Sequence, residues 1–246
     1  MDCVKLAGIK IDNITLQDSL QKLEEFIKSG SPHLITTPNP EIIVAAQKDR
    51  ELFDIINNSD LRLPDGISMV VVSKIKRIPL KERVSGIDFL LASCKLSARK
   101  GWRIFLLGSK KEAVETAGKN LSRQFPGLKI AGIHDGYFSD NNSESIISQI
   151  RQSKADILFA GLGGGRQEKW LKKNLAELGV KAAIGVGGSF DVISGIKKRA
   201  PIWVQKLYIE WLYRLVTEPN RWKRQLALPK FLWLTLLTSP DPLPEG

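Results

Sequence analysis

The sequence predicts an α/β fold, in which a mainly parallel, Rossmann-like sheet carries helices on both faces and is followed by a C-terminal helical appendage. Short apolar runs alternate with amphipathic stretches up to about Gly195, as in a doubly wound sheet. Runs such as RIFLLG and DILFAG are apolar throughout, which is typical of strands covered by helices on both faces. After Gly195 the chain becomes basic and rich in tryptophan. Its 246 residues suffice for one large α/β domain, which we place at 1–195, with the appendage at 196–246.

The candidate strands are short apolar runs, and helical patterns lie between most of them. The first helical pattern opens with Thr15 and Asp18, spaced as in a capping box, and closes at Gly30. Another helix is expected to start near Ile67. The strands are expected at residues 4–11, 33–37, 61–63, 102–108, 128–138, 155–163 and 181–190, and the other helices at residues 15–30, 40–58, 110–125, 143–152 and 166–178.

The appendage is predicted to be helical and strongly amphipathic. Between residues 203 and 216, apolar side chains recur four positions apart in two adjacent rows, which predicts a helix with a wide apolar face. Pro219 should end this helix and begin another. The final apolar run, residues 231–237, is far short of the roughly 20 residues that a membrane span requires. The apolar face can therefore lie on a membrane surface, or it can pack on the domain or on a second subunit, and composition alone leaves these readings open.

The charge of the chain is concentrated in the appendage. The formal net charge is +11, and residues 196–230 contain nine Lys or Arg against two Glu, a net charge of +7. Both nucleic acids and anionic membrane surfaces attract such a tract. No recognised nucleic-acid module occurs, although a basic nucleic-acid-binding protein remains an alternative. The N-terminus lacks a basic region followed by an apolar core, so we expect no signal peptide and a cytoplasmic location.

The junctions that follow the strands carry the candidate site, because open α/β sheets bind ligands at the carboxyl ends of their strands. Thr37 and Asn39 follow one strand, although an Asn-Pro pair is also an ordinary helix start. Asp65 lies between a proline and a glycine after the next strand. It is either a turn residue that caps the helix near Ile67 or a catalytic base beside Asn39.

Two further junctions are rich in glycine and predict a phosphate-bearing substrate. Backbone N–H groups in such loops can approach an anion closely at a helix N-terminus. Neither loop has the dinucleotide pattern G-x-G-x-x-G, because Arg166 and Phe190 occupy the last glycine position, and neither is a P-loop. A nicotinamide-dependent enzyme is therefore disfavoured, and we expect no cofactor. The candidate phosphate-binding glycines are Gly163, Gly164, Gly187 and Gly188.

The sequence lacks the residue patterns that two kinds of metal site require. The chain has two histidines and two cysteines without ligand spacing, which argues against a zinc site. It has no Asp-x-Asp pair of the kind that holds a metal on a nucleotide diphosphate in many sugar transferases. A diphosphate leaving group would then need arginines and backbone amides. Arg214, Arg221 and Arg224 in the appendage are the candidates, although they can also be solvated or contact lipid phosphates.

In its motifs the sequence resembles the WecG/TagA/CpsF family of bacterial glycosyltransferases. The matching stretches run in order from Thr37 to Arg224, and they are TPNPEI, LPDGISMV, ERVSGIDF, GLGGGRQEKW, GVGGSFDVISG, KRAPIWVQ and EWLYRLVTEPNRWKR. Two positions depart from the family pattern: Gly165, where proline is common, and the sequence YIEW, where Gly-Leu-Glu-Trp is common. Neither departure removes a polar functional group.

The resemblance implies an inverting transferase that moves a sugar from a UDP-sugar to an undecaprenyl-diphosphate-linked acceptor at the inner face of the cell membrane. The nearest branch is that of teichoic-acid synthesis, which adds N-acetylmannosamine to lipid-diphosphate N-acetylglucosamine; N-acetylmannosaminuronic acid and glucose are alternative donor sugars. Residues 1–195 would be the catalytic domain, and residues 196–246 would dock on the membrane and complete the active site. Without a membrane, the apolar face is expected to drive self-association.

The resemblance also implies which side chains surround the active site. It makes Asp65 the base that removes the proton from the attacking sugar hydroxyl. A single carboxylate is sufficient for direct displacement with inversion, because no covalent intermediate forms. The other implied site residues are Thr37, Asn39, Arg83 and Gln167.

Overall fold

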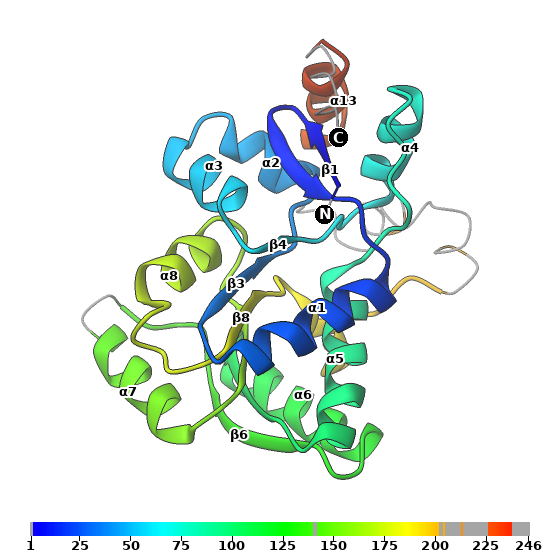
Figure 1. Ribbon diagram of the computed structural model, residues 1–246. Helices are drawn as coiled ribbons and strands as arrows, with labels where there is room; N and C mark the ends of the chain where they lie inside the picture. Colours follow the sequence, from blue (N-terminus) through cyan, green and yellow to red (C-terminus); the bar gives the residue numbers. More distant parts are fainter. Residues whose placement is uncertain (1, 140–141, 202–203, 205–212, 214–225, 238–246) are drawn as a thin grey trace.

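The computed structural model describes residues 2–139, 142–201, 204, 213 and 226–237. Six strands form a parallel sheet in the order β4-β3-β8-β7-β5-β6. The α/β prediction with a mainly parallel sheet is therefore confirmed (Figure 1). The strands are β3 (His33–Thr36), β4 (Leu61–Arg62), β5 (Arg103–Gly108), β6 (Lys129–His134), β7 (Ile157–Gly161) and β8 (Ala182–Gly185).

Helices cover both faces of this sheet. On one face, α1 (Leu16–Ser29), α5 (Gly86–Lys100) and α6 (Lys111–Gln124) pack on the strands. The other face is covered by α7 (Ser143–Ser153) and α8 (Arg166–Asn174). Alternate residues of each strand enter the two cores, so Ile104 and Leu106 face one core while Phe105 and Leu107 face the other. This arrangement explains why the strands are apolar throughout.

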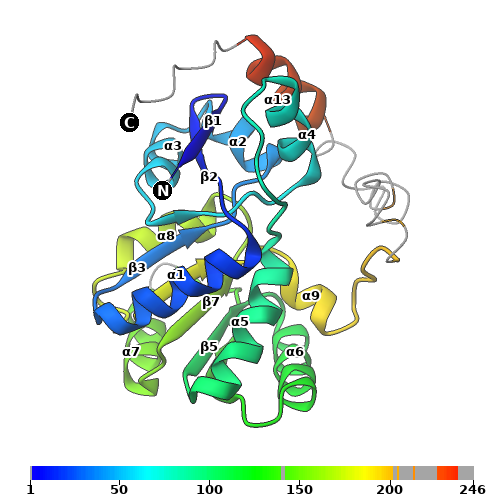
Figure 2. The ribbon, with the colours of Figure 1, turned by 45° about the vertical axis from the view of Figure 1, so that its right-hand side comes forward.

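A third apolar core lies beyond the carboxyl ends of β3 and β4. It joins the hairpin of β1 (Cys3–Leu6) and β2 (Ile9–Asp12) to several helices. Figures 1 and 2 both show this group at one end of the molecule. The helices of the group are α2 (Pro40–Ala46), α3 (Arg50–Asn57), α4 (Ile67–Ile75) and α13 (Ala227–Leu237).

The C-terminal helix α13 packs on the N-terminal part of the chain. It contacts α2 and α4, and Phe231 is fully buried in the third core. Lys76 at the end of α4 donates a hydrogen bond from Nζ to the backbone oxygen of Thr235 at 2.8 Å. The predicted helix at residues 203–216 lies outside the described residues.

The predicted strand at residues 4–11 is wrong as a single element. The chain turns at Ala7 and Gly8, which have φ values of 49° and 78°, and β1 and β2 pair antiparallel. A two-residue turn of this hand matches the twist of a hairpin. The hairpin forms a sheet of its own, apart from the six-stranded sheet.

Other element boundaries also differ from expectation. Residues 40–58 form two helices, because Asp49 accepts a hydrogen bond from the Leu52 N–H and begins α3. The predicted strand 181–190 ends at Gly185, and its remainder begins the short helix α9 (Ser189–Ile193). Helix α5 was not predicted, although Ser85 caps its start. By contrast, the capping box of Thr15 and Asp18 and the left-handed Gly30 at the ends of α1 are confirmed.

Candidate active site

A cleft of about 610 Å³ opens where the strands of the parallel sheet end, which is the volume of a small-molecule site. Junctions after all six strands line it. Most of the predicted site residues meet here. Those that line the cleft are Thr37, Asn39, Asp65, Gly163, Gly164, Gln167, Gly187 and Gly188.

Asp65 reaches the cleft on the turn between β4 and α4. Since β4 pairs parallel with β3, the Asp65 N–H donates to the Pro38 carbonyl at 3.1 Å, which places this turn beside the turn that carries Asn39. The prediction that Asp65 lies beside Asn39 is therefore confirmed. The N-cap of α4 is Gly66, with no side-chain capping hydrogen bond, so Asp65 is not the N-cap residue.

Thr37 and Asn39 also hold the local fold. The Asn39 side chain caps α2, because its Oδ1 accepts a hydrogen bond from the Ile42 N–H at 3.0 Å. The buried Thr37 hydroxyl donates to the Gly185 carbonyl at 2.9 Å and so links the ends of β3 and β8. The helix-start reading of the Asn-Pro pair is thus correct, and the same residue lines the cleft.

The two glycine loops leave room for a ligand at their surface. Gly163 has a φ of +93° and Gly187 a φ of +53°, a backbone conformation that other residues rarely adopt. A Cβ atom added to either residue, or to Gly188, would meet no atom within 4 Å. Helix α8 begins directly after the first loop, so the positive end of its dipole lies at the cleft.

Gln167 joins the two loops. Its Oε1 accepts a hydrogen bond from the Gly187 N–H at 3.1 Å, and its Nε2 donates to Glu168 Oε1 at 2.9 Å. Glu168 Oε2 in turn accepts from the Gly165 N–H at 2.7 Å. Burial raises the pKa of the Glu168 carboxyl, against the hydrogen bonds from Gln167 and the backbone.

Arg83 was predicted as a site residue, but it does not line the cleft. The other predicted site residues that the structure describes all do. Its guanidinium lies 3.4 Å from Asp88 Oδ2 near the start of α5. Asp88 also accepts from the Ser85 hydroxyl, and its Oδ1 lies 2.6 Å from Arg199, which does line the cleft. Burial tends to raise the pKa of Asp88, but the Ser85 hydrogen bond and the charges of Arg199 and Arg83 outweigh it, so this pKa lies below its ordinary value.

Asp191 makes a second link to the basic segment that contains Arg199, residues 197–199. It accepts a hydrogen bond from the Ser109 hydroxyl and forms an ion pair of 2.8 Å with Lys197. The cleft and its immediate supports also include residues not predicted from the sequence, namely Asp88, Asp191, Lys197 and Arg199. The available signal was that Asp88 and Asp191 stand within motifs already quoted, ERVSGIDF and GVGGSFDVISG.

The cleft wall carries more basic than acidic side chains. The Arg166 guanidinium donates to the carbonyls of Gly136 and Phe138 and lies 5.0 Å from the centre of the Phe138 ring. Tyr137 is 74% exposed at the cleft and offers an aromatic face. The basic lining residues are Lys110, Arg166, Lys197, Lys198 and Arg199, against the acidic Glu41, Asp65 and Asp191.

The appendage is described only in part. Arg214, Arg221 and Arg224, the candidates for diphosphate binding, lie outside the described residues. Packing on the domain accounts for the buried Phe231 of α13. In the described ranges, no helix combines the length and the apolar character that crossing a bilayer requires. Exposed apolar side chains nevertheless gather on α4 and α13, namely Val71, Ile75, Trp233, Leu236 and Leu237.

Comparison with known proteins finds relatives that match nearly the whole chain. A family model described as "Glycosyl transferase WecG/TagA/CpsF family" matches residues 4–242. The N-acetylglucosaminyldiphosphoundecaprenol N-acetyl-beta-D-mannosaminyltransferase of Bacillus subtilis (strain 168) is 41% identical over 239 residues, which cover 96% of this chain and 92% of the relative. The protein of the same name from Staphylococcus aureus (strain NCTC 8325 / PS 47) is 32% identical over 232 residues, covering 94% and 91%.

Proposed function

Since this chain belongs to the WecG/TagA/CpsF family of glycosyl transferases, we propose that it transfers N-acetylmannosamine from UDP-N-acetylmannosamine to undecaprenyl-diphosphate-linked N-acetylglucosamine. The names of its relatives support this acceptor and this sugar. The transfer would be a step in the synthesis of the wall teichoic acid linkage unit. Donors with N-acetylmannosaminuronic acid or glucose are the alternatives.

One observation carries the proposal: Asp65 shares a single cleft with both glycine loops and the basic segment 197–199. A carboxylate is suited to accept a proton, and glycine loops with cationic side chains are suited to bind a diphosphate. The exposed Tyr137 can pack against a nucleoside base at the rim. The cleft thus offers separate groups for the acceptor and for the leaving group.

The reaction would be a direct displacement with inversion. Asp65 takes the proton of the attacking acceptor hydroxyl as its oxygen bonds to the anomeric carbon of the donor. The bond from that carbon to the UDP oxygen breaks, and UDP leaves with its electron pair. Backbone N–H groups of the glycine loops and the basic side chains stabilise the charge on UDP, as in sites built on preorganised donors.

An undecaprenyl-linked acceptor would be anchored in a membrane, so the reaction would take place at a membrane surface. We propose that the chain acts on the inner face of the cell membrane as a peripheral protein, with residues 196–246 as the docking segment. The net charge of +7 in residues 196–230 and the exposed apolar side chains of α13 support this proposal. Arg214, Arg221 and Arg224, which lie outside the described residues, would then pair with diphosphate oxygens.

The test is a transfer assay with defined substrates. The protein is incubated with a panel of UDP-sugars and a lipid-diphosphate N-acetylglucosamine analogue, and the product is identified by mass spectrometry. A product larger by one N-acetylhexosamine, formed from UDP-N-acetylmannosamine in preference to the other donors, is the expected result. If no UDP-sugar is transferred in the presence of anionic vesicles, the proposal is wrong.

A further inference from the structure

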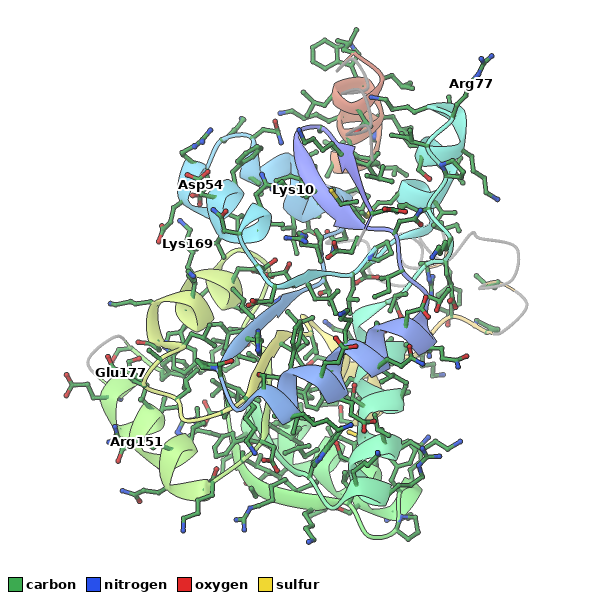
Figure 3. The ribbon with its side chains drawn as sticks, in the orientation of Figure 1. Lys10, Asp54, Arg77, Arg151, Lys169 and Glu177 are labelled. Atoms are coloured by element: carbon green, nitrogen blue, oxygen red, sulfur yellow. The ribbon has the colours of Figure 1, made fainter. Side chains whose placement is uncertain are left out.

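Glu168 is a buried carboxyl group for which the proposed reaction has no use. It is the third residue of α8 and is only 1% exposed. The ionic contacts between α8 and the start of α3 belong to the next residue, Lys169, which Figure 3 labels. Lys169 pairs with Asp49 at 2.7 Å and with Glu51 at 2.8 Å. Glu168 instead directs both of its oxygens at polar groups around the glycine loops.

The hydrogen bonds around Glu168 form one connected network, which links the two glycine loops. Gly165 N–H and Gln167 Nε2 each donate to a different oxygen of Glu168. Because Gln167 uses its amide nitrogen there, its Oε1 is left to accept the Gly187 N–H. In this arrangement both oxygens of Glu168 act as acceptors, one for the Gly165 N–H and one for the Gln167 amide.

Packing limits the alternatives to this arrangement. A Cβ atom added to Gly185 would lie 2.7 Å from Gln167 Nε2, so the Gln167 side chain fills the space beside β8. If the amide were reversed, its oxygen would face the Glu168 oxygen and its nitrogen would face the Gly187 N–H. Neither contact would then be a hydrogen bond, because the first would pair two acceptors and the second would pair two donors.

We propose that Glu168 is a positioning residue: through the Gln167 amide it holds the two glycine loops at the spacing that a nucleoside diphosphate requires. The proposal rests on the proposed function, because it assumes that these loops bind the diphosphate of the donor. Glu168 itself is not among the residues that line the cleft. Loss of one acceptor oxygen would release one loop from the other without opening the apolar cores of the sheet.

UDP binding measured by calorimetry tests this positioning role directly. Glu168→Gln has one acceptor oxygen in place of two, and it should weaken UDP binding roughly 10-fold to 100-fold, the usual effect of a hydrogen bond to a charged group. Gln167→Ala should weaken binding by a similar factor, because it cuts the same chain. Glu177→Gln, which removes the same charge from an exposed position beyond α8, is the matched control and should leave the affinity unchanged.

The double variant distinguishes positioning from a general structural effect. If Glu168 acts through Gln167, adding Glu168→Gln to Gln167→Ala should produce no further loss of UDP affinity. Losses that multiply in the double variant would overturn the proposal, as would an unchanged affinity of Glu168→Gln. If Glu168→Gln does not fold, faster hydrogen exchange at the Gly187 amide in Gln167→Ala supports the link, and unchanged exchange overturns it. Failure of the unmodified protein to bind UDP would instead contradict the proposed function.

Discussion

At the scale of single residues, Asp65 carries the chemistry of the proposed reaction. Replacing Asp65 with Asn keeps the size of the side chain and removes its basicity, so the transfer rate should fall by about 10²-fold to 10⁴-fold. Because Gly66 is the N-cap of α4, the variant should unfold at nearly the same temperature as the unmodified protein. The measurements are steady-state transfer kinetics and thermal unfolding. An unchanged rate would assign Asp65 to the turn alone.

The raised pKa of Glu168 predicts how the stability of the folded chain depends on pH. Its pKa is raised by burial above the ordinary value of 4.5, so between these two pKa values the folded chain binds more protons than the unfolded chain. The stability contributed by Glu168 is therefore greatest below about pH 4.5 and falls as pH rises through the folded-state pKa. Urea unfolding of the unmodified protein and of Glu168→Gln at several pH values between 5 and 8 should show a stability difference that shifts in favour of the variant as pH rises. A constant difference would contradict the raised pKa.

The absence of an Asp-x-Asp pair from the sequence predicts how the activity responds to chelation. If cationic side chains and backbone amides stabilise the leaving diphosphate, transfer should persist in excess EDTA at an unchanged rate. The assay compares turnover with EDTA, and with EDTA followed by magnesium or manganese. Loss of turnover that either metal restores would show that the reaction requires a divalent cation.

Residues that line the cleft could be predicted from the sequence where a local pattern identifies them. Asp65 stands out because a charged residue interrupts two apolar stretches, and the glycine loops are evident from composition. Asp88 and Arg199 are different, because 111 positions separate the two partners of this ion pair. No spacing rule relates such positions, and only the folded sheet brings the start of α5 to the segment after α9.

At the scale of elements, the start of α5 fixes the basic segment at the cleft. Asp88→Asn removes the charge that pairs with Arg199 and Arg83, so UDP should bind more weakly and the transfer rate should fall. Since the pKa of Asp88 is lowered on folding, its stabilising effect is present above the ordinary value of 3.8 and is lost as pH falls through the folded-state pKa. The variant should therefore be less stable than the unmodified protein at pH 7, and the difference should shrink as pH falls below 3.8.

The control for Asp88 is an ion pair within one element. Asp54 pairs with Arg50 at 3.0 Å, four residues earlier in α3, and both side chains are largely exposed. Asp54→Asn should change neither UDP affinity nor the transfer rate, because exposed pairs of this kind contribute little. Equal effects of the two variants would mean that Asp88 has no particular influence on the cleft.

Element prediction failed where local turn chemistry overrides the apolar pattern. The run at residues 4–11 is apolar enough for one strand, but Ala7 and Gly8 reverse the chain within it. Helix α5 carries capping signals at both ends, Ser85 and the left-handed Gly101, yet its apolar residues do not form a clear stripe. By contrast, α1 has both a capping box and a strong apolar face, and its predicted bounds agree with the structure.

At the scale of the whole molecule, the C-terminal part of the chain returns to the N-terminal part. The sequence left open whether the apolar side chains of the appendage pack on the domain or lie on a membrane. For α13, Phe231 is fully buried against α2 and α4, while Trp233 is 62% exposed. Amphipathicity alone cannot show whether such a helix packs on the domain or on a membrane. The apolar surface against which α13 packs belongs to segments some 150 or more residues earlier in the chain.

This packing leads to a prediction for the chain truncated after Gly195. The two cores on the faces of the sheet contain no residue of α13, so the truncated chain should fold. Its third core loses Phe231 and exposes the apolar surface of α2 and α4, so it should unfold at a lower temperature and self-associate. It also loses the net charge of +7 in residues 196–230, where each Lys or Arg near anionic lipid contributes roughly 1 kcal/mol. Vesicle sedimentation should therefore show little binding, and lipid acceptor should be glycosylated slowly.

Phe231→Ala in the full-length chain separates the two roles of the appendage. It removes a fully buried ring at a cost of about 3–5 kcal/mol of stability, yet it retains every basic side chain. The variant should therefore unfold at a lower temperature and still bind anionic vesicles, whereas the truncated chain should lose both properties. If Phe231→Ala binds vesicles as poorly as the truncated chain, docking depends on the placement of α13 rather than on charge. If the truncated chain glycosylates lipid acceptor as fast as the full chain, the appendage has no part in catalysis, and the cleft at the ends of the strands is complete without it.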